Sequence, residues 1–158
     1  LINNASSFYP TRLAETTEEQ WQDLITTNMK APYFLTQLVA PYLKPDNGCI
    51  INITDIHAER PLKGYSVYSA AKSGLKMLTR ALALELAPDI RVNGIAPGAI
   101  LWPELMDEPA KEKILARTAL KRKGEPGDIA MATRFLINNA NYMTGEILTI
   151  DGGRSLYM

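Results

Sequence analysis

The sequence predicts an α/β domain in which a parallel β-sheet is covered by helices on both faces. Short, β-branched, apolar segments alternate along the chain with longer segments of helical pattern, and this alternation is typical of parallel sheets built through right-handed crossovers. The segment CIINI at Cys49–Ile53 is mostly apolar, as expected for a strand that is buried on both sides. The chain of 158 residues is long enough for one domain with its own core.

Composition and charge exclude several classes of function. The chain has 17 Lys and Arg residues and 17 Asp and Glu residues, and this balance argues against nucleic acid as a partner. No apolar run approaches the length of a membrane span, so no membrane partner is expected. The single cysteine, Cys49, is expected as a buried strand residue and fits a reducing compartment, the cytoplasm. Because His57 is the only histidine and the acidic residues lack metal-ligand spacing, no metal site is expected.

The amino-terminal part of the chain predicts the end of a strand followed by one long, interrupted helix. Leu1–Asn3 runs from an apolar pair into a polar turn. We therefore expect the end of a strand whose beginning is missing, in a chain that is part of a longer protein. Thr17 opens a capping-box pattern, and apolar residues continue with helical spacing to about Tyr42. Pro32 predicts a break or bend near Asn28–Ala31.

Turn and breaker residues divide the rest of the chain into strands and helices. The turn signal PDNG precedes the apolar strand. Pro88 stops a long helix rich in Ala, Leu and Lys, and Pro126 lies in the first turn of another helix, where helix starts favour it. The expected elements are strands at Cys49–Thr54, Arg91–Ala96 and Glu146–Ile150, and helices at Ser66–Ala87, Asp107–Ala119 and Pro126–Asn138.

A tyrosine and a lysine one helical turn apart form a candidate catalytic pair. Tyr68 and Lys72 are four residues apart in the long helix, so their side chains are expected on the same face. An ammonium near a phenol favours the phenolate and is expected to lower the tyrosine pKa from about 10. Such a tyrosine can donate a proton as hydride arrives. Taken alone, the pair also fits a solvated helix face with a partly packed tyrosine.

Six short patterns, each unspecific by itself, occur in one order along the chain. They are N-N-A at Asn3–Ala5, the lone Asn28 inside a helix, N-I-T-D at Asn52–Asp55, Y-S-A-A-K at Tyr68–Lys72, R-V-N-G-I-A-P-G at Arg91–Gly98 and T-G-E-I-L-T-I-D-G-G at Thr144–Gly153. Together they resemble the short-chain dehydrogenase/reductase family over essentially the whole chain.

The resemblance implies a Rossmann-type, doubly wound domain, of which residues 1–158 would form the C-terminal part, and a nicotinamide cofactor. The glycine-rich turn that holds the pyrophosphate does not occur in this sequence, so the first half of the fold is expected to be missing. Tyr68 would be the acid/base, Lys72 would lower its pKa and hold the nicotinamide ribose, and Asn28 would support a water-linked proton path. The implied cofactor-binding residues are Asn3, Ala5, Ser6, Ile53, Thr54, Tyr68, Lys72, Pro97, Gly98 and Ile100.

The sequence departs from most of this family thirteen residues before the tyrosine, where Asp55 stands in place of the usual serine. An ionised carboxylate only accepts hydrogen bonds, whereas a ketone oxygen needs a donor. A nitrogen heterocycle with ring N–H and amino groups can meet an acceptor, or can be protonated by a relay through Asp55. The alternative interpretation is that Asp55 is a turn or helix-cap carboxylate.

Asp55 and the segment N-N-A-S-S-F-Y-P at Asn3–Pro10 together resemble the pteridine reductase branch. Phe8 would form one wall of a slot in which a pterin lies against the nicotinamide, because flat aromatic groups prefer offset stacking. Ser6 would bind both the pterin and a cofactor phosphate, although Phe8 also fits plain core or lid packing. The implied substrate-binding residues are Ser6, Phe8, Asp55, Tyr68, Leu101 and Trp102.

By the same resemblance, the cofactor is expected to be NADPH, so that NADP is favoured over NAD, and the protein is expected to be a homotetramer. Leu101–Pro109 corresponds to the family's mobile substrate loop, and its apolar side chains fit either a flat ligand or ordinary loop packing. Arg154, in the tail that follows the last strand, is not assigned to a site. The primary interpretation is an NADPH-dependent reductase of pteridines, Tyr68, Lys72, Asp55 and Asn28 being catalytic. A carbonyl reductase such as a 3-oxoacyl-thioester reductase, and a nucleotide-binding scaffold without turnover, are the alternatives.

Overall fold

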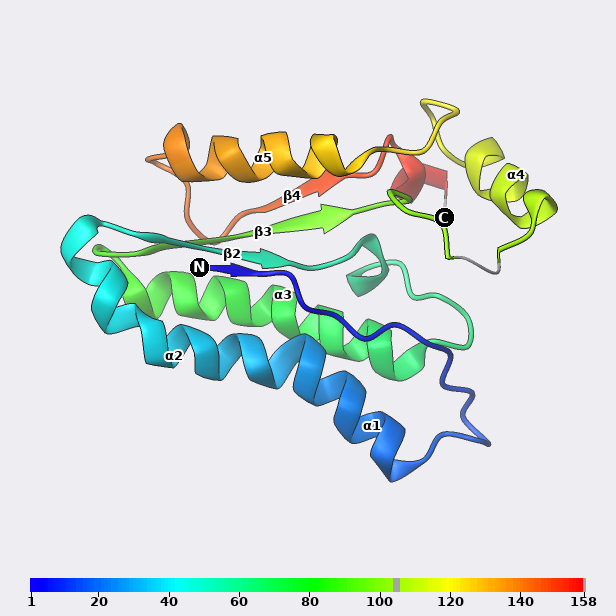
Figure 1. The fold of residues 1–158 in the computed structure, drawn as a ribbon, viewed down its shortest axis with the longest axis horizontal. Helices are drawn as coiled ribbons and strands as arrows, with labels where there is room; N and C mark the ends of the chain where they lie inside the picture. Colours follow the sequence, from blue (N-terminus) through cyan, green and yellow to red (C-terminus); the bar gives the residue numbers. More distant parts are fainter. Residues whose placement is uncertain (104–105, 158) are drawn as a thin grey trace.

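A four-stranded parallel sheet forms the centre of the molecule (Figure 1). The computed structural model describes residues 1–103 and 106–157. The strands lie in the order β1-β2-β3-β4, which is also their order along the chain, and all three pairings are parallel. The expected α/β class is therefore confirmed. The strands are β1 (Ile2–Asn3), β2 (Cys49–Ile53), β3 (Arg91–Pro97) and β4 (Ile147–Ile150).

The first helical segment is interrupted where the sequence predicts a break. Thr17 accepts a hydrogen bond from the Gln20 N–H, and the Gln20 side chain accepts one from the Thr17 N–H, so the predicted capping box is confirmed. Pro32 has no N–H to donate to the carbonyl of Asn28, so the α-helical hydrogen-bond pattern is interrupted there. A π-helical segment takes its place. The elements are α1 (Glu18–Ile25), the π-helix η1 (Thr26–Lys30), α2 (Ala31–Leu43) and the short 3-10 helix η2 (Lys44–Asp46).

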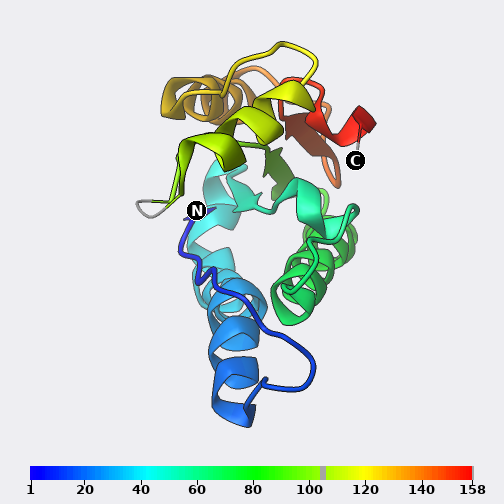
Figure 2. The same cartoon turned by 90° about the vertical axis from the view of Figure 1, so that its right-hand side faces the viewer.

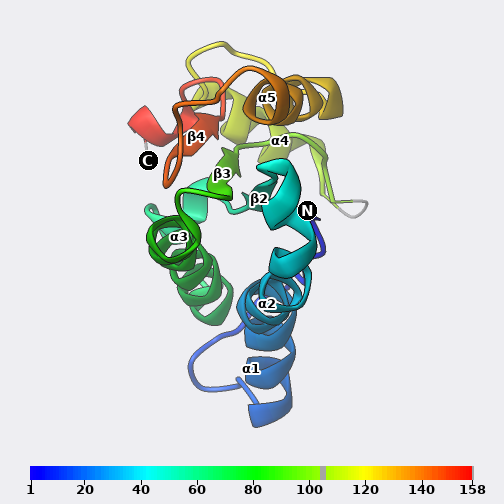
Figure 3. The same cartoon turned by 90° about the vertical axis from the view of Figure 1, so that its left-hand side faces the viewer.

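Helices cover both faces of the sheet. Helices α2 and α3 lie below the sheet in Figure 1 and α5 lies above it, and the end-on view in Figure 3 shows the same three layers. The short helix α4 stands beyond the carboxyl ends of the strands (Figure 1). The remaining helices are the 3-10 helix η3 (Ile56–Ala58), α3 (Ser66–Leu86), α4 (Glu108–Ala116), α5 (Pro126–Asn138) and the 3-10 helix η4 (Arg154–Tyr157).

Consecutive residues of a strand pack on opposite faces of the sheet. Ile50 and Val92 point to the α3 face and pack with Leu82 and Ala83. The next residue of β2, Ile51, packs on the α5 face with Ile95, Leu136 and Ala140. Because side chains alternate along a strand, a strand that is apolar at consecutive positions supplies both faces. This explains why CIINI lacks the alternation of a half-exposed strand.

Leu136 tests this packing, because it is fully buried between α5 and the sheet. We expect Leu136→Ala in the full-length protein to lower the free energy of unfolding by about 2–5 kcal/mol, because a buried leucine lost to alanine leaves a cavity. Urea denaturation followed by circular dichroism measures the change. Met131→Ala on the same helix is the control, since Met131 is 66% exposed, and an equal loss in both variants would contradict the assigned core.

Element ends differ from the sequence predictions by a few residues, most of all at α4, which ends at Ala116 rather than Ala119. The expectation that Cys49 is buried is wrong, because it is the first residue of β2 and only half-buried. Within the described residues, the structure has no helix that is both long and apolar enough to cross a membrane.

Candidate active site

The candidate site lies at the carboxyl ends of the parallel strands, which is where open α/β sheets place ligands. Figure 2 views the molecule from this side. The segments that follow β1, β2 and β3 carry Ser6, Asp55 and Gly98 respectively. Helix α3 runs beneath β2 and β3 and brings Tyr68 and Lys72 to the same edge.

Tyr68 and Asp55 form a direct hydrogen-bonded pair. The Tyr68 hydroxyl donates to Oδ2 of Asp55 at 2.7 Å, and the tyrosine side chain is buried. The other carboxylate oxygen, Oδ1, accepts the backbone N–H of His57 at 2.8 Å, which makes Asp55 the cap of η3. The cap interpretation of Asp55 is therefore confirmed for one oxygen, while the other oxygen accepts the Tyr68 hydroxyl.

The expectation that Tyr68 has a lowered pKa is wrong for this arrangement. Burial raises the pKa of Tyr68, and the charge of Asp55 and its hydrogen bond with the phenol raise it further, while the Ser6 hydroxyl acts in the opposite direction. The physical reason is that a carboxylate beside a phenol disfavours a second negative charge. Tyr68 is consequently held as a protonated donor.

Lys72 lies on the same face of α3 as Tyr68, as predicted from their spacing. Its Nζ is 5.8 Å from the centre of the Tyr68 ring and donates a hydrogen bond to the carbonyl of Ile53 at 2.9 Å. Burial lowers the pKa of Lys72 to about 8, and the Asp55 carboxylate opposes that shift. The ammonium therefore stands at the end of β2, beside the Tyr68–Asp55 pair.

Asn28 anchors the segment that follows β1. It is fully buried in the π-helix η1. Its Oδ1 accepts the Ser6 hydroxyl at 2.7 Å, and its Nδ2 donates to the carbonyls of Ser7 and Leu24, both at 3.0 Å. The structure thus brings Asn28 and Ser6 together, and the Asn28 side chain acts here as a positioning group.

Phe8 packs against two tyrosines. Its ring stacks on Tyr65 with centroids 4.7 Å apart and planes at 18°, and it meets Tyr68 edge-on at 4.8 Å. Phe8 remains 45% exposed. Because one ring face is occupied by Tyr65, only the other face remains for a flat ligand. The sequence did not assign Tyr65 to the site.

A cavity of about 590 Å³ gathers several of the residues that the resemblance assigned to the cofactor and substrate. Ile53, Pro97, Gly98, Ile100 and Leu101 all line it. The cavity lies between the strand ends and α5, which contributes Ile129, Thr133 and Ile137 among others. Its lining is mainly aliphatic side chains and strand-end backbone.

Four other assigned residues are placed differently. The Asn3 amide donates to Asn52 inside the sheet at 2.8 Å, and the Thr54 hydroxyl donates to the Ile95 carbonyl at 2.9 Å. Both side chains therefore stabilise the fold, and the Thr54 N–H also donates to the Ile95 carbonyl, at 2.7 Å. Ala5 is exposed and Trp102 is half-buried. Residues 104 and 105 of the expected substrate loop lie outside the described residues.

Gly98 allows two strand ends to meet. Its N–H donates to the carbonyl of Ile150 at 3.0 Å. A Cβ at this position would lie 2.7 Å from both Cα and Cβ of Asp151, a distance that side chains do not adopt. The absence of a side chain therefore lets the end of β3 lie directly against the turn that follows β4.

Arg154 is a charged neighbour of the pair that the sequence did not reveal. It begins η4 and is half-buried. Burial and the nearby Arg117 lower its pKa, whereas Asp55 and Asp151 counteract this shift. Its electrostatic contact with Asp55 depends on the course of the tail after β4, which no local motif indicates. Among the described residues, no group of three or more His, Cys, Asp or Glu side chains can hold a metal ion.

Together these groups can donate a proton and hold a hydroxylated ligand. Tyr68 is a buried acid, Asp55 accepts from it, and Lys72 places a positive charge within reach of both. The arrangement suits general acid catalysis, in which a positioned side chain protonates a reacting atom.

Comparisons with known proteins show which family this chain resembles. The family model described as "Enoyl-(Acyl carrier protein) reductase" matches residues 1–155. The 3-oxoacyl-(acyl-carrier-protein) reductase FabG of Thermotoga maritima is 38% identical over 158 residues, which cover 97% of this chain and 64% of that protein. Pteridine reductase 1 of Leishmania tarentolae is 37% identical over 180 residues, which cover 99% of this chain and 62% of that protein.

The fold is shared as well. A solved structure of an apo SCOR enzyme from Clostridium thermocellum superposes with a TM-score of 0.88 at 34% identity, over 99% of this chain and 62% of that one. The chain thus spans a little under two thirds of the relatives that it matches. With a family model that matches nearly its whole length and a Rossmann-like sheet shared with these relatives, the chain belongs to the short-chain dehydrogenase/reductase family.

Proposed function

We propose that the protein is an NADPH-dependent reductase of pteridines that converts a dihydropterin to a tetrahydropterin. The single observation that carries this proposal is the 2.7 Å hydrogen bond from Tyr68 to Asp55, at the position where most of the family has a serine. When bound, the cofactor supplies a hydride to the carbon of a C=N bond. Tyr68 supplies the proton to the nitrogen. Asp55 and Lys72 control the protonation state of the Tyr68 phenol.

The chemistry of Asp55 favours a nitrogen heterocycle over a ketone. A carboxylate has no proton to donate to a carbonyl oxygen, but it can accept from the ring N–H and amino groups of a pterin. The raised pKa of Tyr68 keeps the phenol protonated at neutral pH, and a nitrogen that gains electrons is a strong base. The pair is thus suited to protonate nitrogen.

Phe8 and Ser6 support the same substrate. The exposed part of the Phe8 ring offers an aromatic surface beside Tyr68, on which a flat pterin can stack. The Ser6 hydroxyl, which donates a hydrogen bond to Asn28, lies in the same segment after β1 as Phe8. The likeness to pteridine reductase 1 of Leishmania tarentolae over 99% of this chain is consistent with this interpretation.

The residues at the strand ends fit the nicotinamide end of a dinucleotide. The 590 Å³ cavity is apolar enough for a flat ring, and its backbone at Pro97, Gly98 and Ile100 can bind a carboxamide. Lys72 would hold the ribose hydroxyls through its ammonium, and the cofactor is proposed to be NADPH by likeness to the pteridine reductases. Cys49, the one cysteine, agrees with a cytoplasmic location.

A 3-oxoacyl-thioester reductase is the second candidate, and the relatives favour it. The Thermotoga maritima protein named 3-oxoacyl-(acyl-carrier-protein) reductase FabG is 38% identical to this chain, and the same reductase of Chlamydia muridarum is 37% identical. In this reaction Tyr68 would protonate a ketone oxygen and Asp55 would need a proton of its own to donate.

A substrate panel separates the two. Full-length protein is incubated with NADPH and either dihydrobiopterin or an acetoacetyl thioester, and cofactor oxidation is followed by absorbance. We expect turnover with the pterin. Turnover with the thioester alone would replace the proposed function by the second candidate, and tight NADPH binding without turnover on either substrate would indicate a scaffold.

The lowered pKa of Lys72 predicts how cofactor affinity depends on pH. Because burial brings this pKa to about 8, the ammonium assigned to the ribose is present below pH 8 and is lost above it. We expect the Kd for NADPH, measured by fluorescence titration, to rise as the pH passes through about 8. Asp55→Asn removes the carboxylate that raises the pKa of Lys72, so the rise begins at lower pH. An unchanged profile in Lys72→Met would assign the effect to another group.

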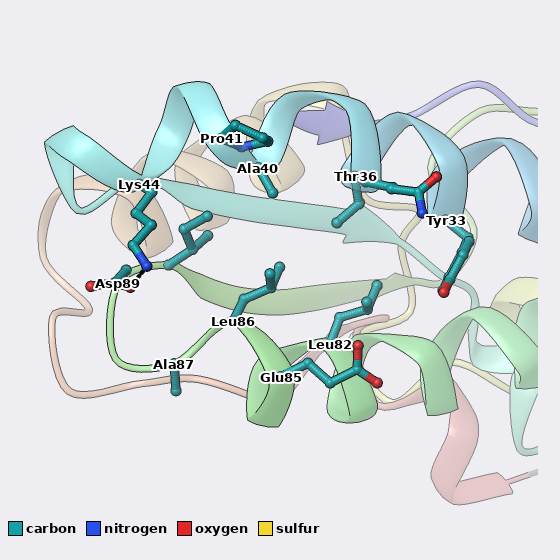
Figure 4. A pocket seen from close by; sticks show the side chains of 12 residues that line it. Tyr33, Thr36, Ala40, Pro41, Lys44, Leu82, Glu85, Leu86, Ala87 and Asp89 are labelled. Atoms are coloured by element: carbon teal, nitrogen blue, oxygen red, sulfur yellow. Dashed lines mark ion pairs between the residues drawn. The ribbon is translucent and has the colours of Figure 1, made fainter.

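We also propose that the protein is a homotetramer that assembles through the face formed by α2 and α3. Large apolar side chains are exposed on both helices, among them Leu38 (66%), Tyr42 (78%) and Leu84 (83%). Figure 4 shows the groove of about 510 Å³ between these helices, with the Lys44–Asp89 ion pair at one end. Light scattering of Leu38→Glu and wild-type protein tests this assembly, which predicts smaller particles for the variant.

A further inference from the structure

A second, smaller cavity reaches Asp55 and does not include Tyr68 among its lining residues. It has a volume of about 150 Å³ and lies between α3, β4 and the segment after β2. We call it the rear cavity. Its ionisable lining residues are Asp55, Glu59, Lys76, Arg80 and Glu146. Asp55 is thus the one residue that belongs both to the rear cavity and to the Tyr68–Asp55 pair.

The rear cavity is suited to hold water and to carry protons. Its volume admits several water molecules, and its polar walls supply the hydrogen-bond partners that such water needs. Lys76 forms an ion pair with Glu59. The Lys76 side chain is 15% exposed and that of Glu59 is 66% exposed, so the pair connects the interior of the cavity with the surface.

Lys76 is surrounded by charge from three elements. Glu59 follows η3, Arg80 lies one turn further along α3, and Glu146 precedes β4. Burial lowers the pKa of Lys76, the like charge of Arg80 lowers it further, and Glu146 acts against the shift. Ionisable groups of both signs thus surround the Lys76 ammonium in the rear cavity.

The proposed reaction needs a solvent proton to reach Tyr68 after each turnover. Each reduction consumes one proton from solvent, and a Tyr68 phenolate beside the Asp55 carboxylate is unfavourable until a proton arrives. Asp55 is also faced by the positive charges of Lys72 and Arg154, neither of which lines the rear cavity. The Asn28 side chain is committed to Ser6, Ser7 and Leu24.

We propose that the rear cavity is the route by which solvent protons reach the active site, through water held by the Lys76–Glu59 pair and then through Asp55. The inference rests on the proposed roles of Tyr68 and Asp55. As the Tyr68 O–H bond breaks and its proton passes to the substrate atom, a proton from the cavity water moves to Asp55 and on to the phenolate oxygen. The protein returns to its starting state with one solvent proton consumed.

Lys76→Met in the full-length protein tests the route, because methionine keeps the aliphatic stem but removes the charge. We expect kcat to fall about tenfold, less than the 10²–10⁴-fold that a directly reacting acid contributes, because Tyr68 still donates the proton to the substrate. The solvent isotope effect on kcat should increase, and the isotope effect from deuterated NADPH should decrease, since proton supply becomes slow relative to hydride transfer. The Kd for NADPH should not change.

Lys44→Met is the matched control, because Lys44 forms an ion pair with Asp89 outside the rear cavity. It should leave kcat and both isotope effects at wild-type values. Thr149→Phe is the second variant and fills the cavity from β4, where Thr149 is exposed. It should reproduce the isotope effects of Lys76→Met without removing any charge.

The outcomes separate this inference from the proposed function. Wild-type isotope effects in both Lys76→Met and Thr149→Phe would overturn the route, whichever substrate is turned over. A protein that reduces only the acetoacetyl thioester would remove the pterin assignment and still permit the test, because that reaction also consumes one proton. Reduced kcat with unchanged isotope effects would show a structural role for Lys76 and would likewise overturn the route.

Discussion

Tyr68→Phe is expected to lower kcat by about 10²–10⁴-fold, the range that general acid groups contribute, and to leave the Kd for NADPH unchanged. The substitution removes only the hydroxyl that donates to Asp55, and phenylalanine preserves the ring that packs with Leu24 and Val67. Steady-state kinetics with NADPH and the substrate that the wild-type protein reduces measure the loss, and fluorescence titration measures cofactor binding.

Tyr65→Phe is a closely matched control for this experiment. Tyr65 immediately precedes α3, three residues before Tyr68, and its ring stacks on Phe8. The Tyr65 variant should retain kcat to within about twofold, because the stack needs the ring and not the hydroxyl. Full activity in Tyr68→Phe, or equal losses in the two variants, would contradict the assignment of Tyr68 as the acid.

Asp55→Ser is expected to reverse the preference between substrates. Serine restores a donor for a carbonyl oxygen and replaces the charged, two-oxygen acceptor for pterin N–H groups by a single neutral hydroxyl. We expect turnover of dihydrobiopterin to fall about a hundredfold and turnover of the acetoacetyl thioester to increase. Burial and the Asp55 charge both raise the pKa of Tyr68, and the substitution removes the second cause. The phenol should therefore ionise at lower pH than in the wild-type protein, which ultraviolet difference titration against Tyr68→Phe detects.

Asp55→Asn separates charge from shape in this comparison. Asparagine retains an oxygen that can accept the His57 N–H and so cap η3 as Asp55 does, but it carries no charge. It should lower the pKa of Tyr68 as serine does, without raising thioester turnover to the same extent. If Asp55→Ser leaves the ratio of the two turnover rates unchanged, Asp55 does not select the substrate.

The order and type of the elements could be predicted from the sequence because local patterns decide them. The Thr17 capping box, the break at Pro32 and the helix from Pro126 to Asn138 each depend on residues adjacent in the chain. The same-face placement of Tyr68 and Lys72 follows from helical geometry. These predictions needed no knowledge of tertiary contacts.

The electrostatics of the site could not be predicted in this way. The raised pKa of Tyr68 depends on burial and on how closely Asp55 approaches, neither of which spacing reveals. The stack of Phe8 on Tyr65 joins residues far apart in the chain. Arg154 interacts electrostatically with Asp55 only because the segment after β4 lies near the carboxyl ends of the strands. Each of these depends on long-range packing.

The close approach at Gly98 has a consequence for how substitution data on this protein are interpreted. A side chain there would force apart the end of β3 and the turn at Asp151. That turn precedes Arg154, and Oδ2 of Asp151 accepts the Ser155 N–H. A saturation mutagenesis profile would therefore show position 98 as intolerant to every substitution, in the same manner as Tyr68. The two positions differ in what fails: at Gly98, alanine should already disturb the fold, whereas Tyr68→Phe should keep the packing with Leu24 and Val67 and lose only activity.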